Sequence, residues 1–139
     1  MDYKKKHGSN FIRHMISFPF IWAVLFPVLF FDLILEIYHR TCFALYGLPY
    51  IKRREYIRVD RHKLKYLAWY DKINCMYCGY VNGFLQYAVK IAGETEKYWC
   101  GIKHQPTSEK FHEPLHHKNF MEYGDKKEFD EQCKLQIKK

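Results

Sequence analysis

The stretch from Met15 to Phe31, MISFPFIWAVLFPVLFF, decides the fold class of this chain. It runs for 17 residues without a charged side chain, whereas 27% of all residues in the 139-residue sequence are charged. A helix that crosses a bilayer needs about 20 apolar residues, so this run lies near the lower limit for one crossing. We therefore expect a membrane anchor that extends, with its flanks, from Phe11 to Ile51. The alternative is a soluble protein in which this segment is the core helix.

Pro27 lies inside the apolar run and should kink or break a helix, because proline lacks the N–H that an interior helical position donates. The anchor is therefore expected to be either a helix or a re-entrant hairpin bent near Pro27. The following segment, Asp32 to Leu48, has an amphipathic pattern that favours a helix lying in the membrane interface over a second crossing. Gly47 and Pro49 are expected to end this helix. Its polar face carries Asp32, Glu36, His39 and Arg40.

The formal net charge is +8, and basic residues flank the apolar run on both sides. Positive residues mark the cytoplasmic side of a membrane, so a single crossing conflicts with one of the two flanks. A re-entrant hairpin, or a short helix followed by an interfacial one, satisfies both flanks. Lys and Arg contribute ~1 kcal/mol each beside an anionic leaflet, so we expect anionic lipid rather than nucleic acid as a partner. The main domain is expected on the cytoplasmic face.

The rest of the chain is expected to be mainly α-helical. Residues 52–106 are expected to form a basic helical Cys/His domain, and residues 107–139 a polar C-terminal tail. Helical spacing predicts one helix over Lys63 to Ile73 and a second that starts with Asn82 as its N-cap. Gly93 is the natural C-cap of that second helix.

The clearest local motif is a pair of short ligand spacings, Cys75-x2-Cys78 and Cys100-x3-His104. Thiolate and imidazole are the preferred ligands of structural zinc, and a short spacing lets two ligands from one turn hold the same face of the ion. An odd number of cysteines, five in all, argues against a secreted disulfide framework and for reduced thiols. These four residues therefore predict a structural Cys3His zinc site, with iron as the alternative metal. No pattern assigns a catalytic residue.

The predicted metal site depends on where the helix after Asn82 ends. If residues 82–98 formed one straight helix, its ends would lie ~25 Å apart, too far for the two halves of the motif to share an ion. A helix that stops at Gly93, followed by extended chain, would bring the halves together. An antiparallel dimer would instead pair each half with the opposite half of a second chain. Without a metal, the cysteines would be small buried thiols of the core or a redox pair.

A second group of possible ligands is His112, His116 and His117. His112 and His116 have the spacing that places two ligands on one helical face. Pro114 lies between them and disfavours a helix there. We interpret this group as part of a solvated surface loop.

Two strings of the sequence are improbable by chance: Asn-Cys-Met-Tyr-Cys over residues 74–78 and Tyr-Trp-Cys-Gly-Ile-Lys-His over residues 98–104. Through them, residues 67–104 resemble the core of a family of small uncharacterised bacterial membrane-associated proteins. Relatives commonly have proline where this chain has Gly101, which loosens the turn between Cys100 and His104. The resemblance implies a bacterial source, hence the inner membrane, and a single module formed by the four Cys/His positions. It brings no established activity.

Together these features favour a membrane-anchored, non-catalytic accessory or scaffold protein that binds a membrane protein partner or a second copy of itself. One alternative is an electron-transfer subunit with iron at the same cysteines. Another is an interfacial enzyme on a lipid-type substrate, with Asp32, Glu36 or His39 as polar groups at bilayer depth. Metal content would separate the first two, and a deep apolar pocket ending at Asp32 or Glu36 would favour the third.

Overall fold

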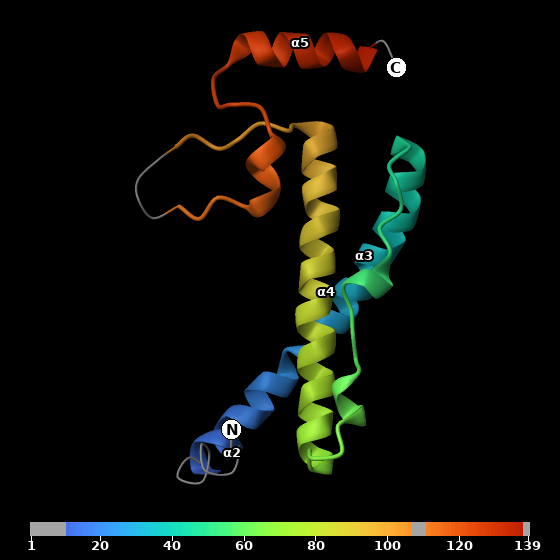
Figure 1. Ribbon diagram of the computed structural model, residues 1–139, viewed down its shortest axis with the longest axis vertical. Coiled ribbons are helices and arrows are strands. Elements are labelled where there is room, and N and C mark those ends of the chain that lie inside the picture. Colours follow the sequence, from blue (N-terminus) through green and yellow to red (C-terminus); the bar gives the residue numbers. More distant parts are fainter. Residues whose placement is uncertain (1–10, 107–110, 138–139) are drawn as a thin grey trace. The chain divides into compact units, whose positions relative to one another are not determined.

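The computed structural model describes residues 11–106 and 111–137, and within these ranges the chain is mainly helical, as expected, and has no β-strand. The chain divides into two compact units, residues 1–87 and 88–139. The division falls inside the longest helix, whereas the sequence suggested boundaries at 51/52 and 106/107. The α-helices are α2 (Phe11–Ala23), α3 (Leu25–Tyr46), α4 (Trp69–Trp99) and α5 (Lys126–Ile137), and the 3-10 helices are η1 (Arg53–Glu55), η2 (Arg61–Lys63) and η3 (Leu115–Asn119) (Figure 1).

The apolar run forms α2 and the start of α3, and the two helices together make a 35-residue helical stretch, Ile12–Tyr46. The interruption between them lies at Val24, just before Pro27. Pro27 has no N–H to donate to the carbonyl of Ala23, four residues earlier, and α2 ends at Ala23. The next helical hydrogen bond, from Val28 N to Val24 O, is made at 3.3 Å. The predicted break near Pro27 is confirmed. The re-entrant hairpin is wrong, because α2 leads into α3 without doubling back (Figure 1).

α3 ends at Gly47, as the sequence indicates. Gly47 adopts a left-handed conformation with φ 65°, which glycine enters without a steric penalty. The N–H of Leu48 then bonds to Phe43 O at 2.9 Å and closes the last turn. Residues 48–68 return along α3 and then along the first half of α4 (Figure 1). The helix predicted over Lys63 to Ile73 is wrong in its first half, because this segment forms turns up to Ala68.

α4 is longer than the sequence suggested, because two residues expected at its ends lie inside it. Asn82 is not an N-cap: its side-chain amide donates to Cys78 O one turn earlier, at 2.9 Å. Gly93 is not a C-cap, and α4 continues past it to Trp99. The stop comes at Gly101, which has φ 60° and whose N–H bonds to Glu96 O at 2.9 Å.

Two interior glycines of α4 mark where the returning segment approaches the helix closely. A Cβ on Gly83 would lie 2.7 Å from Tyr56 O and 2.9 Å from Ile57 Cα, and a Cβ on Gly79 would lie 2.8 Å from Arg58 O. All three are contacts with backbone atoms, which cannot rotate away. These glycines therefore set how tightly residues 56–58 pack on α4. We call this contact the glycine notch.

Within residues 1–87 a small aromatic core lies between α3 and α4. Phe31 of α3 meets Phe84 of α4 edge to face, with 5.4 Å between ring centroids. The buried apolar side chains are Val28, Leu35, Phe43, Ile51, Val81, Phe84 and Tyr87. The outward side of α2 and α3 is also apolar, with Phe18, Phe20, Ile21, Phe26, Leu29, Phe30, Leu33, Ile34, Ile37 and Leu45 exposed.

In residues 88–139 the segment after α4 folds back on the second half of that helix. Lys103 N bonds to Met121 O at 2.9 Å, and Met121 N bonds to Gly101 O at 2.8 Å, so the chain just after α4 pairs with Met121. His117 and Phe120, which precede Met121, are buried. The interpretation of the histidine group as solvated loop is therefore wrong for His117, although His112 is exposed.

Candidate functional site

The polar face of α3 points inward, although this helix belongs to the apolar anchor. Asp32 is only 8% exposed. Its carboxylate accepts hydrogen bonds from both Nη atoms of Arg53, and the Tyr80 hydroxyl donates to Oδ2 at 2.5 Å. The hydrogen bond to Asp32 raises the pKa of Arg53, while burial and the same carboxylate raise the pKa of Tyr80 to about 12. Both partners therefore keep their protons at neutral pH, and Asp32 is fully paired.

A chain of hydrogen bonds fixes the tautomer of His39, which is completely buried. The backbone N–H of Ile51 donates to His39 Nε2 at 3.3 Å, so that nitrogen carries the lone pair. Nδ1 then carries the proton and donates to the Tyr87 hydroxyl at 2.9 Å. Tyr87 in turn donates to Glu36 Oε2 at 3.3 Å. The imidazole is thus neutral and has both of its nitrogens occupied.

Glu36 completes this network at its exposed edge. Its Oε1 accepts from Arg40 Nε at 2.7 Å and from the Tyr50 hydroxyl at 3.1 Å, and the Tyr50 ring stacks on His39 with 4.3 Å between centroids. Asp32, Glu36, His39 and Arg40, the polar side chains of this face of α3, thus all have hydrogen-bond partners within residues 32–87. We call the whole set the polar cluster: Asp32, Glu36, His39, Arg40, Tyr50, Arg53, Tyr80 and Tyr87.

A different group of side chains converges in residues 88–139. Glu96, His104 and His117 each offer one potential metal-ligand atom, and these atoms lie within 4.8 Å of one another. Nε2 of His117 donates to Glu96 Oε1 at 3.1 Å, and Nε2 of His116 donates to Oε2 at 2.9 Å. Burial raises the pKa of the Glu96 carboxyl, but the two histidine hydrogen bonds outweigh it and hold this pKa below its ordinary value. We call Glu96, His104 and His117 the Glu/His group.

The members of the Glu/His group differ in how accessible they are. His117 is 0% exposed, and its Nδ1 makes no hydrogen bond with any residue that the structure describes. Since its Nε2 already donates to a carboxylate, Nδ1 holds a buried lone pair without a partner, which costs about 1–3 kcal/mol. The His104 ring lies beside it, 5.2 Å away between centroids, and is exposed. The group therefore joins one enclosed ligand to one that faces solvent.

The four residues predicted to bind zinc are divided between the two compact units, Cys75 and Cys78 in the first and Cys100 and His104 in the second. Cys75 and Cys78 lie on the first half of α4, whereas Cys100 is the first residue after it and His104 follows. α4 continues through Gly93, so the single-chain form of the site lacks the helix stop that it was expected to need. The Cys3His site stays a prediction, in its single-chain form and in its antiparallel dimeric form. Cys78 and Cys100 are exposed, so they are not buried core thiols.

Comparison of the chain with protein families, with curated proteins and with solved structures finds no match. The resemblance over residues 67–104 stays a prediction. The case for a function therefore comes from the residues of this chain alone.

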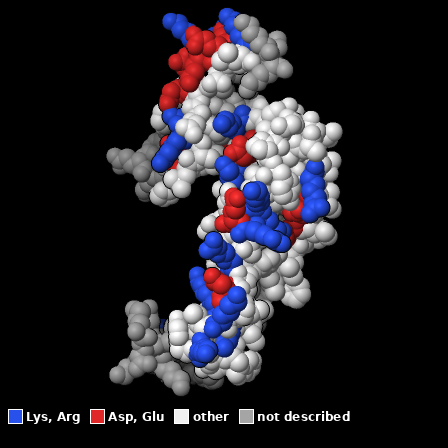
Figure 2. All heavy atoms as spheres, turned by 45° about the vertical axis from the view of Figure 1, so that its right-hand side comes forward, with Lys and Arg blue, Asp and Glu red and all other residues white. Residues whose placement is uncertain are grey.

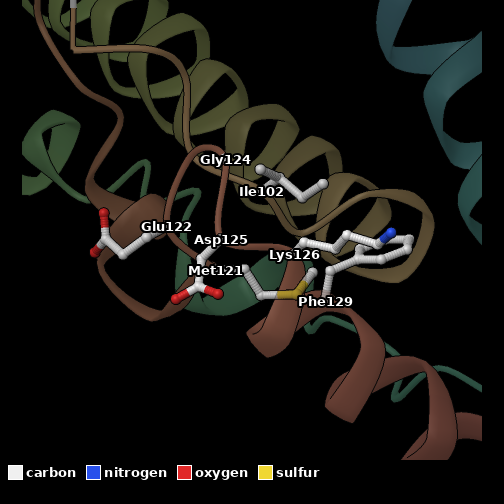
Figure 3. Close-up of a pocket in the computed structure, with 7 residues that line it drawn as sticks. All are labelled: Ile102, Met121, Glu122, Gly124, Asp125, Lys126 and Phe129. Atoms are coloured by element: carbon white, nitrogen blue, oxygen red, sulfur yellow. The ribbon is translucent and has the colours of Figure 1, made fainter.

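One open cavity of about 290 Å³ lies among residues 102–129. Ile102, Met121 and Phe129 supply its apolar lining, and Glu122 and Lys126 stand at its sides (Figure 3). Its volume is at the lower limit for a small-molecule site. It contains none of Asp32, Glu36 or the Glu/His group, so it does not support the interfacial-enzyme interpretation.

Sequence reasoning missed several residues that these clusters use. Tyr80 and Tyr87 both face α3, and a signal was present, because residues seven apart share one face of a helix. Glu96 was missed because its partners follow some twenty residues later, in a segment without helical periodicity. Only Phe120, the apolar residue shortly after the histidine pair, hinted that this segment packs against another part of the chain.

Proposed function

We propose that this chain is a membrane-anchored, non-catalytic accessory or scaffold protein whose anchor is formed by α2 and α3. The observation that carries the proposal is the inverted placement of side chains on α3. Asp32 and His39 are buried, while Phe26, Leu33 and Leu45 are exposed. A helix of a soluble protein has the opposite arrangement, whereas a helix in lipid turns its apolar side outward and its polar side to protein.

The length and composition of the helical stretch support this proposal. Ile12–Tyr46 is the one helix among the described residues that is long and apolar enough to cross a membrane. Its 35 residues rise ~52 Å, more than the ~30 Å hydrocarbon core. The second half of α3 would therefore extend into the interface, where its polar face is paired with Arg53 and three tyrosines.

The charges after α3 support a cytoplasmic position for the segment that follows the anchor. Lys and Arg side chains succeed one another along one face (Figure 2). We propose that this face contacts anionic lipid on the cytoplasmic side, in keeping with the positive-inside rule. The exposed basic residues are Lys52, Arg54, Arg58, Arg61, Lys63 and Lys65.

The state of the polar cluster favours a non-catalytic role over an interfacial enzyme. A general acid or base needs a proton or lone pair free to reach a substrate. Asp32 accepts three hydrogen bonds, and His39 has both nitrogens engaged. These groups join α3, the returning segment and α4, and their hydrogen bonds would have to break before any of them could act on a substrate.

The anchor is tested by charging its outer surface. Phe26 and Phe30 are 76% and 66% exposed, so replacing both by arginine removes little packing. In a bilayer, each arginine near the helix centre costs ~2.5–3.5 kcal/mol of insertion. We expect the wild-type chain to remain in the membrane pellet after an alkaline wash, and Phe26→Arg/Phe30→Arg to be released.

The matched control is Leu115→Arg, because Leu115 is 82% exposed but lies outside the anchor. This variant should stay in the pellet like the wild type. Recovery of the wild-type chain without detergent, as a soluble monomer, would contradict the proposed anchor.

A further inference from the structure

We propose that Glu96, His104 and His117 bind a divalent transition-metal ion of the zinc class. The site differs from the one that the cysteine spacing predicted, and shares only His104 with it. It also does not depend on the proposed membrane anchor, because all three ligands lie in residues 88–139.

The donor types fit such an ion. Two imidazoles and one carboxylate are a known ligand set for zinc in proteins, with bonds of about 2.0–2.2 Å. Bonds of that length around a tetrahedral ion separate the ligand atoms by ~3.3 Å. The ligand atoms of the Glu/His group already lie within 4.8 Å of one another. The ligand atoms would therefore have to approach one another by no more than ~1.5 Å, and the exposed side chain of His104 can rotate to bring its nitrogen closer.

The surroundings hold two of the ligands in place before an ion arrives. His117 is completely buried and its ring stacks on Phe120, with 4.7 Å between centroids. The second carboxylate oxygen of Glu96, Oε2, accepts a hydrogen bond from His116, which orients the carboxylate. The His116 ring packs against Gly93, where a Cβ would lie 2.9 Å from the ring. An outer partner that orients a ligand in this way is typical of protein metal sites. Gly93 thus serves the site by admitting His116, not by ending the helix.

Ligation would change the tautomer of His117. Its Nε2 is the nitrogen that faces Glu96, so this nitrogen would have to give up its proton to bind the ion. Nδ1 has no hydrogen-bond partner among the described residues, so its lone pair is free to take up that proton. Three protein ligands leave a fourth position on the ion, and the exposed side of His104 makes that position reachable from solvent.

The test uses the full chain, without a histidine tag, purified in detergent and stripped with a chelator. Co²⁺ is added first, because its absorption spectrum reports the ligands, and Zn²⁺ is then used to displace it. We expect one ion per chain and a spectrum with d–d bands but without the strong near-ultraviolet charge-transfer band that thiolate ligands give. His104→Ala should weaken Zn²⁺ binding by at least about tenfold, measured in competition with a chelating dye.

His104→Ala is the primary variant because His104 is exposed, so its loss leaves the fold intact, which a circular dichroism spectrum verifies. Glu96→Gln should weaken binding by a similar factor. His112→Ala, an exposed histidine outside the group, and the pair Cys75→Ser/Cys78→Ser should leave the affinity unchanged. Three outcomes would overturn the proposal: no stoichiometric binding, an affinity insensitive to His104→Ala, or a thiolate band that disappears in the cysteine variant.

Discussion

Replacing Arg53 by methionine is expected to destabilise the chain by ~3–5 kcal/mol, because the substitution leaves a buried carboxylate without its counter-ion. The Asp32 side chain is only 11% exposed and accepts two hydrogen bonds from the Arg53 guanidinium. Tyr80 alone cannot neutralise the charge. The free energy of unfolding, measured by denaturant titration of the protein in mild detergent, provides the test.

The neighbouring residue supplies the matched control. Arg54 is exposed and belongs to the same basic segment, so Arg54→Met should change the free energy of unfolding by no more than about 0.5 kcal/mol. The double variant Arg53→Met/Asp32→Leu should recover most of the loss, since a buried ion pair is often replaced by apolar residues at little cost. If the two substitutions are instead additive, the ion pair does not hold α3 to the returning segment.

Replacing Gly83 by valine is expected to destabilise the fold by ~2–3 kcal/mol through overpacking at the glycine notch. A Cβ there would lie 2.7 Å from Tyr56 O and 2.9 Å from Ile57 Cα, so the backbone of the returning segment has to move away from α4. This movement also strains the placement of Arg53 in the polar cluster. Thermal unfolding, followed by circular dichroism, measures the effect.

Gln86→Val is the control for the helix propensity of valine, because Gln86 is exposed on the same helix. Its cost should stay below about 1 kcal/mol. Equal losses for the two variants would show that Gly83 matters only through helix propensity and that the notch does not hold the returning segment.

The helical architecture was predictable from local signals, because each acts through the backbone of a few neighbouring residues. Pro27 removes one hydrogen-bond donor, and Gly47 takes up a left-handed conformation, and both effects appear where the sequence places them. Asn82 and Gly93 carry the same local signals, yet α4 runs through both. At Gly93 a tertiary contact explains the glycine: the His116 ring packs so closely that a Cβ would lie 2.9 Å from it.

The clusters were predictable only in part, since they depend on contacts between distant segments. The polar face of α3 was recognised from Asp32, Glu36 and His39, but helical spacing does not reveal whether such a face turns toward lipid headgroups or toward protein. Its partner Arg53 was counted only as one of several basic residues beside the membrane. In the same way, Cys-x2-Cys suggested a metal, although the ligand atoms that converge belong to residues with no short spacing, Glu96 and His117.

The pairing of Asp32 also bears on how the chain is made. In synthesis, Asp32 leaves the ribosome 21 residues ahead of Arg53 and 48 residues ahead of Tyr80. During that interval a nascent α3 carries an unneutralised carboxylate, which costs ~2.5–3.5 kcal/mol at bilayer depth. In the membrane-anchored protein proposed above, α3 therefore settles in lipid only after its partner segments have been translated. Stable insertion of α3 is thus expected only once Arg53 and Tyr80 have been made, and a chain truncated before Arg53 should be retained poorly by the membrane.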